Sequence, residues 1–227
     1  MRPFVLVNCA MSADGKLSTK ERRQVKISGK NDFLRVDRIK AESDAIMVGI
    51  GTVLADNPSL TVKSDELREK RRARGEEENP VRIVVDSAAR IPPNAEILHK
   101  GRGKRIIAVS SRAPEEKVNE LEFVADIILT GNGEVDLVAL MERLHAKGIR
   151  SVMVEGGGTL IGSLFAEDLV DEFCTFVGNM VIGGADAPTP ADGAGFVAEE
   201  DFSRLSLVSA EPLDEGVLLR WKAARSP

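Results

Sequence analysis

The sequence predicts an α/β protein in which a mixed, mostly parallel β-sheet is flanked by helices and ends in an antiparallel hairpin. Short runs of β-branched residues alternate with helical patterns along the chain, as in strand–helix–strand units. Some runs, such as Arg82–Val85, are apolar almost throughout, which indicates strands covered on both faces. The last two runs flank the turn-forming stretch 212–216, which indicates a hairpin.

The predicted strands are short and end at turn-forming residues. In chain order they are Phe4–Met11, Asp44–Ile50, Val81–Asp86, Arg105–Ser110, Asp126–Leu129, Ser151–Glu155, Glu172–Val181, Leu205–Ala210 and Val217–Lys222. Helices are predicted between several of them. One carries apolar residues at positions 137, 140, 141 and 144 and ends at Gly148. Another opens at Pro114, and a third has an apolar stripe from Leu160 to Phe165.

The composition excludes several classes of protein. The chain has 227 residues, 31 Lys and Arg against 36 Asp and Glu, a net charge of -5 and 4% aromatic residues. Its hydrophobic content of 43% excludes wholesale disorder, and no apolar stretch is long enough to span a bilayer. The acidic balance argues against nucleic acid as a partner. We expect a cytoplasmic protein with a single domain over residues 1–227. The charged segment Asp65–Asn79 is predicted to be a solvated helix and loop, with a basic patch for an anionic ligand as the alternative, and we assign it no function.

The sequence has few residues that could bind a metal, form a disulfide or act as a catalytic nucleophile. Cys9 and Cys174 each lie in an apolar run, which indicates two buried, reduced thiols. The histidines are His99 and His145, and no Cys-x-x-Cys or His-x-Glu spacing accompanies them. We therefore expect no metal site and, if the protein is an enzyme, chemistry that depends on a cofactor.

Two glycine-rich turns follow predicted strands. Gly49 and Gly51 begin a Gly-x-Gly-x-x-Gly pattern, but Leu54 replaces the third glycine, so a Rossmann interpretation is weak. The second turn lies within Glu155–Gly162, at a strand-to-helix junction. Glycines there allow a ligand to approach the backbone, and the N–H groups that open a helix bind phosphate groups. The alternative is a plain helix-entry turn without a ligand.

Several segments, in their order and spacing, resemble one enzyme family. They are Ala10–Lys16, Ala41–Val62, Val84–Ser87, Glu155–Thr159, Ile182–Gly184 and Asp192–Phe196. Together they closely resemble the reductase of riboflavin biosynthesis, in its stand-alone archaeal form, over nearly the whole chain. The resemblance implies a dihydrofolate-reductase-like fold, a homodimer, and NADPH as cofactor with NADH as the alternative. It also implies reduction of the ribosyl group of a pyrimidine ribosylamine 5′-phosphate to a ribityl group.

The resemblance assigns residues to both ligands. Cofactor contacts carry over to Thr52, Asp56, Val84, Val85, Asp86, Ser87, Gly156, Gly157, Gly158 and Thr159, with Gly131 and Gly133 as weaker candidates. Substrate contacts carry over to Gln24, Lys40, Ser59, Lys63 and Glu155, of which the two lysines would bind the phosphate. Most of these segments lie just past predicted strands, where ligands of open α/β sheets bind. The implied chemistry is hydride transfer to C1′ of an imine formed from the ribosylamine, and no catalytic side chain is assigned.

The same resemblance implies an order of steps. Bacterial relatives fuse this reductase to a zinc deaminase that acts first. The chain lacks the His-x-Glu and Pro-Cys-x-x-Cys signature of that domain, and we expect no such domain before Met1. In the stand-alone form reduction comes first, so the expected substrate is 2,5-diamino-6-ribosylamino-4(3H)-pyrimidinone 5′-phosphate. The alternatives are the deaminated pyrimidine, a pterin, or a non-catalytic nucleotide-binding domain on the same fold.

Overall fold

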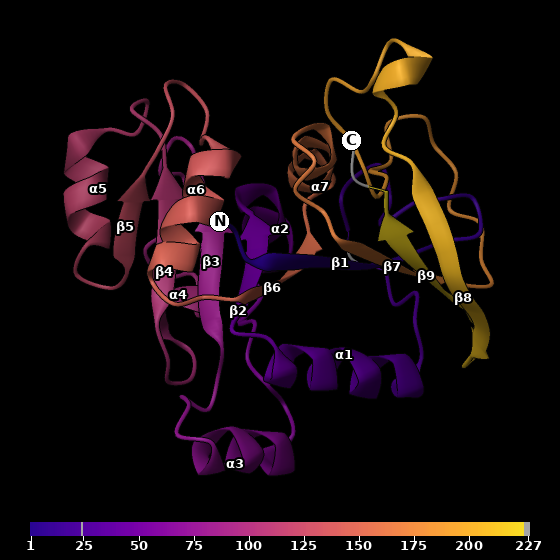
Figure 1. Ribbon diagram of the computed structural model, residues 1–227, viewed down its shortest axis with the longest axis horizontal. Helices are drawn as coiled ribbons and strands as arrows, with labels where there is room; N and C mark the ends of the chain where they lie inside the picture. The colour runs from indigo at the N-terminus through magenta and orange to yellow at the C-terminus, as the bar shows by residue number, and fades with distance from the viewer. Residues whose placement is uncertain (24, 225–227) are drawn as a thin grey trace. The chain divides into compact units, whose positions relative to one another are not determined.

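The computed structural model describes residues 1–23 and 25–224, which form two compact units (Figure 1). Unit 1 consists of Met1–Pro3 and Asp37–Met153. Unit 2 consists of Phe4–Val36 and the described residues from Val154 onward. The expectation of a single domain stays a prediction. None of the helices in the described ranges has the length and apolar character that crossing a bilayer requires.

Unit 1 is built on parallel strands in the order β5-β4-β3-β2. They are β2 (Ala45–Gly49), β3 (Val81–Val85), β4 (Arg105–Val109) and β5 (Asp126–Leu129). The helices of this unit are α2 (Ile50–Asp56), α3 (Asp65–Ala73), α4 (Glu96–His99), α5 (Glu115–Leu121) and α6 (Leu137–Ala146). Residues in the middle of β2, β3 and β4 are buried, as in a parallel sheet covered on both faces. Because the strands are parallel, their C-terminal ends meet at one edge.

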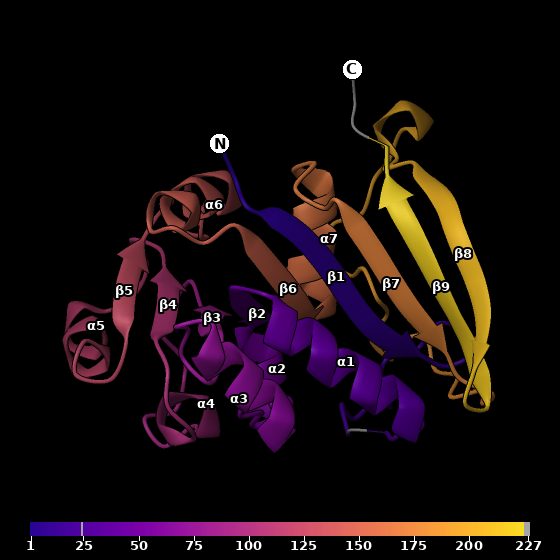
Figure 2. The ribbon, with the colours of Figure 1, turned by 60° about the horizontal axis from the view of Figure 1, so that its bottom comes forward.

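Unit 2 has its strands in the order β6-β1-β7-β9-β8 (Figure 2). They are β1 (Phe4–Met11), β6 (Ser151–Gly156), which begins in unit 1, β7 (Glu172–Val177), β8 (Leu205–Leu213) and β9 (Gly216–Ala223). β1 and β7 pair in parallel, whereas β9 pairs antiparallel with both β7 and β8. Helix α7 (Gly158–Ala166) lies on one side of these strands, and α1 (Lys30–Glu42), which begins in this unit, lies on the other (Figure 1). A short 3-10 turn, η1 (Glu199–Asp201), precedes β8.

The predicted fold class is confirmed, because a mostly parallel mixed sheet carries helices and ends in the antiparallel hairpin β8–β9. The helix predicted to end at Gly148 is α6, and that glycine has a φ of 91° just past the helix end. The charged segment contains the helix α3, as predicted, although Arg71 on that helix is buried. Pro212 lies on β8, where an edge strand tolerates proline.

Two features differ from the sequence-based expectation. The strand predicted to reach Val181 ends at Val177. The N–H of Gly178 still donates to the carbonyl of Met11, where β1 ends, and the chain then follows the loop after β1. The patterns described above also miss α1, α2 and α4. α2 begins within the glycine pattern of Gly49 and Gly51, for which the Rossmann interpretation was weak. A Cβ on Gly51 would meet open space. That pattern therefore marks a helix start.

Candidate active site

The C-terminal ends of β3, β4 and β5 in unit 1 carry hydroxyl groups and a glycine turn. Ser87 follows β3, Ser110 follows β4, and Gly131 and Gly133 lie in the turn after β5. The Ser110 hydroxyl lies 2.8 Å from the carbonyl oxygen of Ser87 and 2.9 Å from that of Gly133. The N–H of Val135 donates to the Ser87 hydroxyl oxygen at 3.1 Å. These bonds bring two predicted cofactor residues, Ser87 and Gly133, to one edge of the strands, where α/β proteins bind ligands.

The rest of the predicted cofactor segment is less accessible. Val84 is 1% exposed and Asp86 is fully buried, whereas Val85 is half-buried. Oδ2 of Asp86 accepts a hydrogen bond of 2.8 Å from the N–H of Ile91, and Oδ1 has no hydrogen-bond partner among the described residues. Burial raises the pKa of Asp86, and the guanidinium of Arg90 lies 3.8 Å from Oδ1. Asp86 therefore shapes the turn after β3, and its predicted contact with the cofactor stays a prediction.

Thr52 and Asp56 lie four residues apart on α2 and so share one side of that helix. Thr52 is half-buried and Asp56 is exposed. The helix ends at Asn57, whose φ of 43° and ψ of 53° are left-handed. Pro58 disfavours the right-handed helical conformation in the residue before it, so the chain turns after Asp56. The Asn57 side chain fixes this turn by accepting a hydrogen bond of 2.8 Å from the N–H of Glu96.

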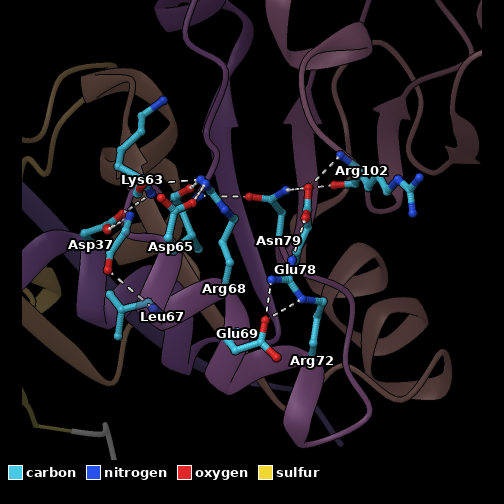
Figure 3. A network of polar contacts seen from close by, with 12 residues as sticks. Asp37, Lys63, Asp65, Leu67, Arg68, Glu69, Arg72, Glu78, Asn79 and Arg102 are labelled. Carbon is cyan, nitrogen blue, oxygen red and sulfur yellow. Dashed lines mark hydrogen bonds and ion pairs between the residues drawn. The ribbon is translucent and has the colours of Figure 1, made fainter.

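Hydrogen bonds hold both the backbone and the ammonium group of Lys63 in place. Its Nζ donates to the hydroxyl oxygens of Ser59 and Thr61, each at 2.9 Å. Its backbone N–H donates to Oδ1 of Asp37 at 2.7 Å, and the side chain points away from that carboxylate (Figure 3). The N–H of Ser64 donates to the other oxygen at 2.8 Å. The resemblance identified Ser59 and Lys63 as substrate contacts but not Thr61 or Asp37. Asp37 is distant from Lys63 in the sequence, and no motif marks Thr61.

The electrostatic field around Lys63 favours an anion. Desolvation lowers the pKa of Lys63, and repulsion from Lys40 and Lys100 lowers it further, against the opposing effect of Asp37 and Glu96. A partly desolvated ammonium group among other cations attracts a phosphate. The structure thus gathers Lys40, Ser59 and Lys63 from the predicted substrate residues within unit 1.

The segment that carries Lys63 is braced by Asn79 (Figure 3). Asn79 is 2% exposed, and its Oδ1 accepts a hydrogen bond of 2.9 Å from the N–H of Val62. Its Nδ2 donates to a carbonyl of the loop after α4 at 3.0 Å. In that loop, a Cβ on Gly101 would lie 2.9 Å from the methyl group of Thr61. The hydroxyl groups that hold the Lys63 ammonium therefore rest on a packed framework.

In unit 2 the predicted glycine turn opens α7. Gly157 is the N-cap with a φ of 94°, a conformation that favours glycine, and no side chain caps the first turn. N–H groups in such a first turn can bind an anion. A Cβ on Gly158 would lie 2.4 Å from the carbonyl oxygen of Thr189 and 2.5 Å from Oδ2 of Asp192. Gly158 therefore also allows α7 to pack closely on the 189–192 loop, a role that the sequence did not indicate.

The other predicted residues of unit 2 flank this turn. Glu155 is half-buried and Gly156 buried at the end of β6, and Thr159 is exposed on α7. Gln24 lies outside the described residues. Among the described residues, no group of three or more His, Cys, Asp and Glu side chains could hold a metal ion. The strand-end hydroxyls of unit 1 fit a nucleotide ligand. The first turn of α7 in unit 2, considered by itself, fits a phosphate group.

Asp14 joins two segments of the family-like pattern. Its carboxylate accepts hydrogen bonds from the Ser12 hydroxyl at 2.5 Å, the N–H of Ile182 at 3.0 Å and the N–H of Gly183 at 2.7 Å. These bonds, that of Ser12 foremost, lower the pKa of Asp14 to about 2. The carboxylate is therefore ionised at neutral pH, where it fixes two loops and has no proton to donate.

Comparison with known proteins gives consistent matches. A model of the RibD C-terminal domain family matches residues 3–219. The chain is 56% identical over 197 residues to the 2,5-diamino-6-ribosylamino-4(3H)-pyrimidinone 5′-phosphate reductase of Archaeoglobus fulgidus, covering 87% of this chain and 90% of that protein. It is 43% identical to the protein of the same name from Methanothermobacter thermautotrophicus, covering 97% and 98%. The solved structure of the Saccharomyces cerevisiae riboflavin biosynthesis reductase Rib7 has the same fold, with a TM-score of 0.70, 24% identity and coverage of 98% and 90%.

Proposed function

Because the chain belongs to the family of the RibD C-terminal domain, we propose that it is an NADPH-dependent oxidoreductase of riboflavin biosynthesis. Its substrate is 2,5-diamino-6-ribosylamino-4(3H)-pyrimidinone 5′-phosphate, and its product carries a ribityl group in place of the ribosyl group. The observation that carries the proposal is the 56% identity to the reductase of Archaeoglobus fulgidus over 197 residues. The Lys63 site gives separate support, because a ribose phosphate needs a cationic site.

The phosphate binds at Lys63, and Lys40 is close enough for its positive charge to attract the phosphate as well. The hydroxyl groups of Ser59 and Thr61 fix the Lys63 ammonium, so little side-chain freedom is lost when the phosphate binds. Lysine is a point charge and not a bidentate fork, so the site attracts the phosphate without imposing a single orientation on it. Orientation of the substrate then depends on its pyrimidine end, for which Glu155 is the predicted contact.

The nicotinamide cofactor supplies the hydride when it is bound. The proposed cofactor contacts in unit 1 are Thr52, Asp56, Ser87 and Gly133. In unit 2, considered separately, the proposed contact is Gly157 with the first turn of α7. We assign no side chain as proton donor, since Asp14 is ionised at neutral pH. Placement of the two reactants is then the main contribution of the protein, and effective molarity accounts for much of the rate.

The experiment follows NADPH absorbance with the diamino substrate and with its deaminated analogue. We expect kcat/KM to favour the diamino compound by about tenfold, because the half-buried carboxylate of Glu155 accepts a hydrogen bond from an amino group and repels a carbonyl oxygen. Equal turnover, or preference for the deaminated ring, would overturn the substrate assignment. Turnover of a pterin alone would indicate a different reductase, and NADPH binding without any turnover would indicate a non-catalytic domain.

We further propose that NADPH is preferred to NADH and that the protein is a homodimer. The dimer is supported by apolar side chains on the β8–β9 hairpin, where Leu207 is 55%, Val208 57% and Val217 39% exposed. The apolar residues of β7 are not available for such an interface, because β7 lies between β1 and β9 and its central residues are buried. The cytoplasmic location and the absence of a nucleic-acid partner stay sequence-based predictions.

A further inference from the structure

The carboxylate of Glu134 lies among the predicted cofactor residues of unit 1. Its Oε2 accepts a hydrogen bond of 3.1 Å from the Ser87 hydroxyl, and its Oε1 lies 3.5 Å from the guanidinium of Arg112. A hydroxyl group and a guanidinium that converge on two oxygens of one anion are also a donor set for a phosphate monoester. None of the family-like segments includes Glu134 or Arg112.

We propose that Arg112 and Ser87 form the subsite that recognises the 2′-phosphate of NADPH, and that Glu134 fills this subsite until the phosphate displaces it. The inference rests on the proposed function, which places a dinucleotide at the turn after β3. It adds the residues that discriminate NADPH from NADH, a distinction that no pattern in the sequence identified.

The Ser87 hydroxyl and the backbone of Arg112 are held in place without Glu134. The Ser87 hydroxyl oxygen accepts the N–H of Val135 at 3.1 Å, and the Ser87 carbonyl is bonded to Ser110. The N–H of Arg112 donates to the Ser110 hydroxyl oxygen at 3.3 Å, which anchors the arginine beside the same strand ends. A phosphate that replaced the carboxylate would therefore meet a positioned hydroxyl and a guanidinium whose backbone is fixed beside it.

The Glu134 carboxylate is bound loosely enough to leave. The side chains of Glu134 and Arg112 are 80% and 54% exposed, and ion pairs at such positions contribute little because water screens them. A phosphate dianion carries more charge than the carboxylate and competes effectively for the guanidinium. The neutral 2′-hydroxyl of NADH does not compete, so Glu134 keeps its place. The ion pair of Glu134 with Arg112 thus lowers the affinity for a 2′-phosphate without abolishing it.

The test measures binding to the full-length protein by titration calorimetry, without turnover. The probes are 2′,5′-ADP and 5′-AMP, which differ by the 2′-phosphate, together with NADPH and NADH. For Glu134→Gln we expect 2′,5′-ADP and NADPH to bind about three- to tenfold more tightly, because the carboxylate no longer repels the phosphate. For Arg112→Ala we expect both to bind about tenfold more weakly. In either variant 5′-AMP and NADH should change by less than about twofold.

The matched control is Asp126→Asn. Asp126 is an exposed carboxylate at the opposite end of β5, 3.8 Å from the Lys147 ammonium, and the control should leave all four affinities unchanged. If the parent protein binds the probes and the Glu134 and Arg112 variants leave the ratio of 2′,5′-ADP to 5′-AMP affinity unchanged, the inference is wrong and the proposed function stands. If the parent binds neither NADPH nor NADH, the proposed function itself fails, and the inference fails with it.

Discussion

The carboxylate of Asp214, in the turn of the β8–β9 hairpin, accepts a hydrogen bond of 2.9 Å from the N–H of Asp32 in the first turn of α1. It also accepts the N–H of Asn31 at 3.1 Å. A Cβ on Gly29 would lie 2.5 Å from the Asp214 side chain, so the glycine makes room for this contact. The Asp214 side chain therefore caps the N-terminus of α1, a helix that begins far earlier in the chain.

We expect Asp214→Asn to lower the Tm at pH 7 by about 2–4 °C, since the uncharged amide caps the helix less well. The N–H groups that Asp214 accepts, that of Asp32 first, lower its pKa in the folded protein. A carboxyl group with a lowered pKa stabilises the fold above its unfolded value of about 3.9, and this contribution is lost as the pH falls through the folded value. The difference in Tm between parent and variant should therefore be full at pH 7 and vanish in strong acid.

Thermal unfolding followed by circular dichroism at several pH values measures this difference. Asp168→Asn is the matched control, because Asp168 is also exposed and has a φ of 51°, close to the 48° of Asp214. A difference that is independent of pH, or as large in the control, would contradict the capping role.

Lys63→Ala should raise the KM for the pyrimidine phosphate about tenfold or more and leave the Kd of NADPH within about twofold. The reason is that a charge-assisted contact to the phosphate contributes about 1.5–3 kcal/mol. Lys70→Ala is the control, because Lys70 is an exposed lysine on α3 that pairs with Glu66 at 2.6 Å. Kinetics of the Lys63 variant that match the control would remove Lys63 from the substrate site.

Gly157→Ala should weaken NADPH binding about tenfold or more, measured by fluorescence titration. A side chain at a φ of 94° strains the N-cap of α7 by about 1–3 kcal/mol and moves the N–H groups of its first turn. Gly148→Ala carries a similar strain, at a φ of 91°, where no cofactor contact is predicted. We expect both variants to lose stability, but only Gly157→Ala should lose affinity for NADPH. Equal affinity in the two would leave Gly157 with a structural role alone.

The sequence predicted the strands well because most are short local runs of apolar residues, such as Val81–Val85, that can be recognised without knowing which strands pair with them. α1 was missed because its cap comes from Asp214, which no local pattern shows. The Lys63 site was predicted only in part for the same reason. Its supports, Asp37 and Asn79, come from segments on either side of Lys63 and meet it only in the folded chain. Motifs located the ligand-facing residues, whereas the residues that position them depend on tertiary contacts.

The last prediction concerns the proposed homodimer. A register shift between Leu207 and Ser209 interrupts the pairing of β8 with β9, and both Leu207 and Val208 are exposed there. Because such an irregularity hinders strand addition at an edge, we expect the two subunits to meet through apolar side chains of the hairpin. Light scattering at micromolar concentration should give twice the chain mass for the parent and a single chain mass for Leu207→Lys, because a buried unpaired charge opposes association. Phe123→Lys replaces another apolar side chain, 90% exposed and distant in sequence from the hairpin, and should stay dimeric. A monomeric parent, or a Leu207→Lys variant that stays dimeric, would show that the hairpin is not the interface.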